Sequence, residues 1–306
     1  DNPADPFSRL GQTWSLPKPV RVDNSYCKAI GENGNSCVAL MFGGGYDSLY
    51  DDNSQFGLTA SGNAKFKGNA IYMVHAETGK LLWWASSDAT EADGKPLSQM
   101  KYPIPSELMV LDTDQDRVVD RVYAGDVAGQ VWRIDLLGKT TDTHEDLTLG
   151  DRLAVFSEVD AKTDQTANER RFFSPPKWTY VDEKDVVAIV SGNRARPRSS
   201  DVQNRIYVII DAGWVLDEFG KNTGTLDTIM ENADGLTTRS GDPLPTNSTG
   251  TLPWYLDLPT VGEKGLGSPA IIKTEEGDDI LLFTTYIPSL PQAGTCVFDE
   301  GVGNLY

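Results

Sequence analysis

The sequence predicts an all-β protein of the β-propeller type, modified by long loop insertions. Its apolar segments are short and rich in β-branched and aromatic residues, and helical periodicity is nearly absent. A set of strand-like segments also recurs in the same order, at intervals of roughly 70 to 90 residues, whereas ordinary propeller blades repeat at about 40 to 50. Small antiparallel units of this kind cannot bury both faces alone, so they stack on their neighbours. A β-sandwich whose strands resemble one another is the alternative.

The first two copies of the repeat each begin with an extended segment that contains proline. The strand-like segments of the first copy are WSLPKPVRV (14–22), CVALMFGGG (37–45) and GNAIYMVHAETGKLLWW (68–84). Those of the second copy are YPIPSELMVLD (102–112), DRVYAGD (120–126), GQVWRIDL (129–136) and LAVFSEV (153–159). Gly, Asn and Asp stand between many of these segments, as expected of tight turns.

The third and fourth copies follow the same order. The third contains FSPPKWTYV (173–181), DVVAIVSGN (185–193) and NRIYVIID (204–211), and its last strand lies in either WVLDEF (214–219) or PWYLDL (253–258). The fourth contains LGSPAIIK (266–273), DILLFTTYI (279–287) and GNLY (303–306). Because this copy stops after its third strand and leaves an unpaired edge, we expect the chain to be part of a larger protein with a larger propeller.

We interpret residues 1–306 as one propeller domain in which about four blades are represented. Two polar stretches rich in loop-forming residues, near 138–171 and 217–253, are interpreted as surface insertions. The blades are expected at approximately 12–85, 100–158, 172–258 and 264–306.

The charge of the chain restricts its partners. The formal net charge is -18, and no cluster of Lys and Arg is dense enough to follow a phosphate backbone, which excludes nucleic acid. Cations are attracted instead. No run of eighteen apolar residues occurs, so no transmembrane segment is expected in this chain.

The cysteines bear on the compartment. Cys27 and Cys37 flank a Gly/Asn-rich turn at which two strands could approach closely enough for a disulfide, while Cys296 lies far away in the sequence. A hairpin disulfide with one odd cysteine suits an exported chain, and three unrelated buried thiols are the alternative.

A loop rich in aspartate is the strongest candidate for a functional site. The segment LDTDQDRVVDRVY (111–123) joins two strands of the second copy and places aspartate at loop positions one, three, five and nine. Such spacing allows a coiled loop to bring alternate side chains together, with the seventh residue offering its backbone carbonyl. The predicted ligands are Asp112, Asp114, Asp116, Val118 (through its carbonyl) and Asp120. An oxygen-only ligand set without histidine or thiolate favours Ca²⁺.

The loop departs from a complete EF-hand. Position six is Arg117 instead of glycine, and position twelve is Tyr123 instead of glutamate, so Asp120 has to act as the last ligand. A solvated acidic turn is the alternative. Repulsion among four aspartates in nine residues disfavours it unless a cation is bound.

The aspartate loop running into VYAGDVAGQVWRIDL, together with VVAIVSGNR, CVALMFGGGYDS and GEKGLGSPAII, resembles the C-terminal propeller of the PilY/PilC family of type IV pilus proteins. The resemblance covers nearly the whole chain, and on the family pattern Asp112, Asp114, Asp116, Val118 and Asp120 match the calcium loop. The Arg-Gly-Asp of some members has no counterpart, since this chain has RSGD at 239–242.

The resemblance implies an exported protein at the bacterial cell surface, on the pilus tip or associated with the outer membrane. It implies roles in pilus biogenesis, in calcium-dependent control of pilus extension and retraction, in twitching motility and in cell adhesion. The implied partners are minor pilins and other pilus tip components, and a host or abiotic surface.

An enzymatic function has weaker support. Quinoprotein dehydrogenases are calcium-dependent propellers, and AETGKLLW (76–83) is similar to one of their tryptophan-docking motifs, but only one copy is clear. Packing between blades explains this tryptophan more simply. The two histidines, His75 and His144, are interpreted as a structural residue in a strand and a loop residue. We therefore expect a non-enzymatic module. The basic cluster RARPR, with Arg194, Arg196 and Arg198, is either a partner-binding loop or a charged turn.

Overall fold

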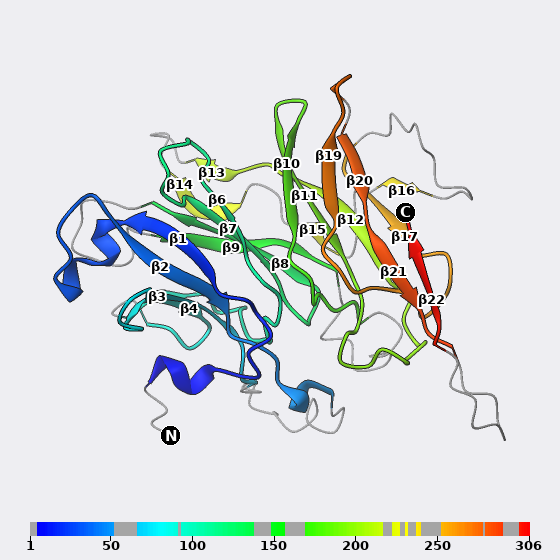
Figure 1. Cartoon of the computed structure of the whole chain (residues 1–306), viewed down its shortest axis with the longest axis horizontal. Coiled ribbons are helices and arrows are strands. Elements are labelled where there is room, and N and C mark those ends of the chain that lie inside the picture. Colours follow the sequence, from blue (N-terminus) through cyan, green and yellow to red (C-terminus); the bar gives the residue numbers. More distant parts are fainter. Residues whose placement is uncertain are drawn as a thin grey trace. The chain divides into compact units, whose positions relative to one another are not determined.

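The computed structural model describes residues 5–51, 66–90, 93–137, 148–156, 169–216, 222–226, 230–231, 237–239, 252–277, 279–289 and 300–306. These ranges consist of β-strands, loops and short 3-10 helices, without an α-helix, and the prediction of an all-β fold is confirmed (Figure 1). The 3-10 helices are η1 (Pro6–Arg9), η2 (Asn24–Tyr26), η3 (Lys28–Ile30) and η4 (Ser48–Asp51). Within the same ranges, no helix has the length and hydropathy needed to cross a membrane.

Contacts divide the chain into two compact units, which we describe separately. The first comprises Asp1–Asp126, Trp132–Arg152 and Val215–Thr225, and the second comprises Val127–Val131, Leu153–Trp214 and Leu226–Tyr306.

The first sheet is built mainly from the first copy of the repeat. Its strands are β1 (Lys18–Asp23), β2 (Ser36–Gly43), β3 (Ala70–His75), β4 (Leu81–Ser86) and β5 (Lys95–Pro96), in the order β1-β2-β3-β4-β5. Strands β1 to β4 are antiparallel, and β5 pairs with β4 in parallel.

Burial in the first sheet follows from the strand period of two residues. In β2 the side chains of Cys37, Ala39 and Met41 are buried, while Val38 between them is exposed. The residues of β3 are all buried, as expected of a central strand. Trp83 is fully buried in the hydrophobic core of the first unit, which fits the simpler structural interpretation of this tryptophan.

The second sheet contains the strands expected of the second copy. They are β6 (Met109–Leu111), β7 (Arg121–Gly125), β8 (Gln130–Leu136) and β9 (Thr148–Val155), joined by the short β15 (Met230–Glu231), in the order β15-β9-β8-β7-β6. The aspartate loop connects β6 to β7, an antiparallel pair whose last ladder pair is Leu111 with Arg121.

The third sheet has the order β10-β11-β12-β17-β16. Its strands are β10 (Lys177–Val181), β11 (Lys184–Val190), β12 (Arg205–Asp211), β17 (Trp254–Asp257) and β16 (Thr237–Arg239). Strand β17 lies in PWYLDL and pairs with β12, which decides between the two candidates for the last strand of this copy. The other candidate forms β13 (Trp214–Leu216), which pairs with β14 (Asn222–Leu226) in a separate two-stranded sheet.

The C-terminal strands differ from the sequence prediction in one respect. The segment DILLFTTYI, expected as one strand, is divided at Phe283 into β20 (Asp279–Leu282) and β21 (Thr284–Ile287). The two parts have different partners: β20 pairs with β19 (Ala270–Lys273), whereas β21 lies between β18 (Lys264–Gly265) and β22 (Val302–Leu305). The sequence of this apolar run does not reveal that its two halves pair with different strands, because each half on its own has the composition of a strand.

The predicted pairing of Cys27 with Cys37 is confirmed: the two form a disulfide between the end of η2 and strand β2. Cys296, His144, and most of the two expected insertions lie outside the described residues.

Candidate metal centre

The ends of the aspartate loop are fixed by three backbone hydrogen bonds. Asp120 donates its N–H to the carbonyl of Leu111 at 2.8 Å, which extends the β6–β7 ladder into the loop. The carbonyl of Asp120 accepts from Leu136 of β8 at 2.7 Å, and the N–H of Val119 donates to the carbonyl of Arg21 in β1 at 2.9 Å. The loop is therefore attached to β1 and to β8, at residues of the first unit.

Aspartate side chains shape the interior of the loop. Asp112 accepts the N–H of Arg117 at 2.8 Å, Asp114 that of Asp116 at 3.1 Å, and Asp116 that of Val118 at 2.7 Å. Aspartate readily makes such local turns, in which one carboxylate oxygen satisfies a nearby backbone N–H. The coil requires left-handed backbone at two non-glycine residues, Gln115 (φ 66°) and Arg117 (φ 74°).

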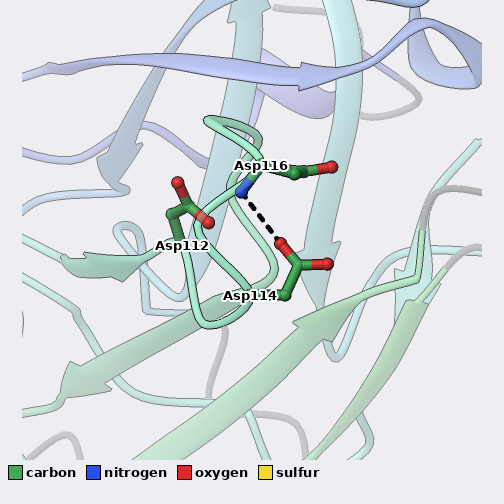
Figure 2. A group of neighbouring side chains, drawn as sticks. All are labelled: Asp112, Asp114 and Asp116. Carbon is green, nitrogen blue, oxygen red and sulfur yellow. Dashed lines mark hydrogen bonds between the residues drawn. The ribbon is translucent and has the colours of Figure 1, made fainter.

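Three of the predicted ligands converge. Asp112, Asp114 and Asp116 each offer a ligand atom, and these atoms lie within 4.8 Å of one another. All three residues are exposed, and Figure 2 shows them projecting from one coiled loop, with the N–H of Asp116 bonded to Asp114. Each carboxylate has a second oxygen beyond the one used in the loop, and a cluster of carboxylate oxygens fits a hard cation such as Ca²⁺.

The other two predicted ligands, Asp120 and Val118, make hydrogen bonds of their own. Asp120 is outside the converging group, and its Oδ2 accepts hydrogen bonds from the N–H of Thr113 at 2.6 Å and from the Thr113 hydroxyl at 2.8 Å. The N–H of Val118 donates to Asp116. Thr113 is the residue that sequence reasoning missed, because a threonine between two aspartates has no signal of its own in the alternating pattern.

Arg121, the first residue of β7, belongs to an ionic cluster. Asp135, 8% exposed, accepts from Arg121 at 2.9 Å and from Arg133 at 3.0 and 2.6 Å. Asp126 is fully buried and accepts the indole N–H of Trp132 at 3.0 Å. Charge-assisted hydrogen bonds of this kind hold the strands that carry the loop in one register.

His75 is positioned as a structural residue. It is 5% exposed, its Nδ1 lies 3.0 Å from the hydroxyl of Thr78, and its Nε2 lies 3.4 Å from a carboxylate oxygen of Glu32.

Fold and loop together define a class: an all-β domain of the propeller type with an exposed acidic loop between two strands. No family model matches the chain. Over 106 residues it is 33% identical to a type IV pilus biogenesis factor PilY1 homolog of Xylella fastidiosa. This alignment covers 34% of this chain and 6% of the length of that protein. Its fold is similar to the crystal structure of the Pseudomonas aeruginosa PilY1 C-terminal domain, with a TM-score of 0.56 and 19% identity, over 92% of this chain and 57% of that one.

Both comparisons return PilY1 proteins, so the resemblance to the PilY/PilC family that the motifs predicted is confirmed. The structural similarity, at 19% identity, establishes the propeller-type fold. Since the match spans 6% of the length of the curated relative, the activity and partners of that protein enter only as a proposal for this chain.

Proposed function

We propose that this chain is a calcium-binding, propeller-type module of a type IV pilus-associated protein. Its roles are in pilus biogenesis, in calcium-dependent control of extension against retraction, and in surface adhesion. The observation that carries the calcium assignment is the convergence of ligand atoms of Asp112, Asp114 and Asp116 within 4.8 Å. The pilus assignment rests on the 33% identity to the PilY1 homolog.

In this proposal Asp112, Asp114 and Asp116 hold the ion, and Asp120 and the Val118 carbonyl complete the set. Calcium supplies the positive charge that relieves the repulsion among these carboxylates. The attachments of Val119 to Arg21 and of Leu136 to Asp120 connect the loop to β1 and β8. Ordering of the loop therefore biases the positions of β1 and β8. The bias is at most the differential affinity of calcium for the two states, about 1–3 kcal/mol.

The proposed module is not an enzyme, and the full protein is exported to the bacterial surface, at the pilus tip or the outer membrane. The proposed partners are minor pilins and other tip components, with a host or abiotic surface as the adhesion target. Residues 1–306 form one propeller domain with about four blades and the insertions near 138–171 and 217–253. The first three sheets take most of their strands from the first, second and third copies in turn, which supports this division for those copies.

Isothermal titration calorimetry of the purified chain with CaCl₂ tests the metal assignment. The double variant Asp112→Asn/Asp114→Asn is expected to lose binding, while Glu275→Gln/Glu276→Gln, which neutralises two exposed acids in the β19–β20 turn, is expected to keep it. If the aspartate double variant bound calcium as tightly as the glutamate double variant, the assignment of calcium to this loop would be wrong.

The pilus role is tested by complementation. In a piliated bacterium whose PilY1-type gene is deleted, a full-length protein carrying this module is expected to restore surface pili and twitching. Intact calcium binding with no restoration would contradict the pilus role alone. Turnover of an alcohol in the presence of pyrroloquinoline quinone and an electron acceptor would instead support the quinoprotein alternative.

A further inference from the structure

A second charged feature, the basic loop at residues 194–198, contrasts with the rest of the chain. The formal net charge is -18, yet this segment places three arginines in five residues. Arg194, Arg196 and Arg198 are all exposed. Like charges so close together raise the local positive potential and attract anions, while the acidic remainder of the surface repels them.

The backbone of this loop is held by a buried ammonium group. Lys264 is 1% exposed, and its Nζ donates to the carbonyl of Pro197 at 3.0 Å and to the carbonyl of Ser199. Burial lowers the pKa of Lys264, and the nearby Asp201 opposes this shift. Removing an ammonium from water is unfavourable unless the group gains hydrogen bonds inside the protein. The buried ammonium group needs hydrogen-bond acceptors, and the carbonyls of Pro197 and Ser199 supply them. These two hydrogen bonds fix the backbone of the exposed loop.

Further contacts fix the same segment. Arg196 donates its N–H to the side chain of Asn193 at 3.1 Å, and Ser199 donates its N–H to the carbonyl of Arg196 at 3.1 Å. Gly262, with φ +85°, packs so closely that a Cβ there would lie 2.5 Å from Cα of Ser200. The conformation of the loop therefore exists before any ligand arrives, which reduces the entropy lost on binding.

We propose that the loop Arg194–Arg198 is a preformed docking site for an acidic peptide segment of a protein partner. Arginine forms bidentate, charge-assisted hydrogen bonds with carboxylates. The three guanidinium groups belong to three separate exposed side chains, and alternate carboxylates of an extended peptide lie about 7 Å apart. Three separate guanidinium groups can each bind a different carboxylate of such a peptide, whereas a single phosphate offers its charge at one point. A long polyanion such as a nucleic acid or a lipid surface also meets the repulsion of the acidic remainder of the chain.

The test measures binding of a fluorescein-labelled peptide with aspartate at three alternate positions, by fluorescence polarisation. The same peptide with asparagine in place of aspartate is the control ligand. We expect binding of the aspartate peptide only, weakened by about tenfold or more between low and high salt. Binding of both peptides alike, or of neither, would overturn the proposal.

Variants of the chain locate the site. Arg194→Ala/Arg198→Ala is expected to weaken peptide binding by about tenfold, whereas Lys28→Ala/Lys80→Ala, which removes the same charge from two exposed lysines elsewhere, is expected to change it little. Lys264→Met keeps all three arginines and is expected to weaken binding through the loop backbone. An unchanged affinity in the double arginine variant would overturn the proposal whatever Lys264→Met does. Capture by phosphatidylglycerol vesicles without binding of the peptide would assign the loop to membranes and refute a peptide partner.

Discussion

Thr113 donates two hydrogen bonds to one carboxylate oxygen of Asp120, from its N–H at 2.6 Å and from its hydroxyl at 2.8 Å. This contact joins the beginning of the aspartate loop to its end. Asp120 is the predicted final ligand, and Thr113, which holds its carboxylate, lies between Asp112 and Asp114 in the sequence. If Asp120 binds calcium as proposed, Thr113 acts as a positioning residue, whose substitution can be compared with that of the ligand itself.

The first prediction concerns this pair. Thr113→Val removes the hydroxyl bond but keeps the N–H bond, so we expect calcium affinity to fall by about three- to tenfold. Asp120→Ala is expected to abolish measurable binding while the circular dichroism spectrum stays that of a β-protein. Thr90→Val is the matched control, because Thr90 donates the same pair of bonds to Asp93, at 2.8 and 2.9 Å, away from the loop. Calorimetry that shows Asp120→Ala binding calcium like the parent would exclude Asp120 as a ligand.

The second prediction concerns the negative charge of Asp114, which is expected to lower the stability of the chain without calcium and to contribute to its stabilisation by calcium. Asp114→Asn keeps the oxygen that accepts the N–H of Asp116 but removes a charge from the cluster. Without calcium we expect the melting temperature of the variant to exceed that of the parent, because repulsion among the carboxylates is reduced. We expect added calcium to raise the melting temperature of the variant by less than that of the parent. Thermal melts in EDTA and in excess CaCl₂ measure both effects. Asp93→Asn is the control, because it keeps a comparable local hydrogen bond outside the cluster. We expect calcium to raise its melting temperature by as much as that of the parent.

How far the site could be predicted depends on what spacing alone can show. Alternate aspartates predicted the convergence of Asp112, Asp114 and Asp116 because a coiled loop brings such positions together. The means of coiling was not predictable: the EF-hand pattern has glycine at position six, whereas here Arg117 itself takes the left-handed conformation. Nor does spacing reveal that the Asp120 carboxylate is bonded to Thr113.

For the fold too, features set by the local sequence could be predicted, whereas those that depend on a distant partner could not. Short β-branched segments predicted the strands, and the Gly/Asn-rich turn between Cys27 and Cys37 predicted the disulfide. The break within DILLFTTYI was not predictable, because it depends on a distant residue. Phe283 exchanges both backbone hydrogen bonds with Tyr306, at 3.1 and 3.0 Å, and is 5% exposed.

The third prediction follows from the left-handed backbone at Arg117. A non-glycine residue with φ of 74° is strained, so Arg117→Gly is expected to stabilise the chain by about 1 kcal/mol in urea unfolding and to raise calcium affinity. Arg117→Gln removes the charge and keeps the strained conformation, so it reports the electrostatic part alone. If the glycine and glutamine variants were equally stable, strain at this residue would be ruled out as the cause.

The fourth prediction concerns the disulfide. Cys27 and Cys37, ten residues apart in the sequence, are buried in the core of the first unit. Cys27→Ser/Cys37→Ser is expected to lower the free energy of unfolding by about 3 kcal/mol, because the cross-link restricts the unfolded chain. Denaturant melts with and without dithiothreitol measure this, and the double variant should be insensitive to the reductant. A parent protein equally stable in dithiothreitol, with its thiols shown to be free, would contradict the expectation.

The last prediction is a dependence on alkaline pH in the second unit. Burial raises the pKa of Tyr207 from 10.0 to about 12, against the opposing effect of Arg170 and Arg205. The folded chain thus retains this proton at a pH where the unfolded chain releases it. The stabilisation is fully present below pH 10 and is lost as the pH rises towards 12, by an amount on the order of 2 kcal/mol.

Tyr207→Phe tests this dependence and retains the ring, which stacks on Phe156 with centroids 3.8 Å apart. Because phenylalanine releases no proton, we expect the variant to lose less stability than the parent between pH 10 and pH 12 in urea unfolding. Tyr180→Phe, at a side chain that is 53% exposed, is the matched control and is expected to follow the parent. Parallel curves for parent and Tyr207→Phe over this range would mean that the Tyr207 proton is held no more tightly in the folded chain than in the unfolded one.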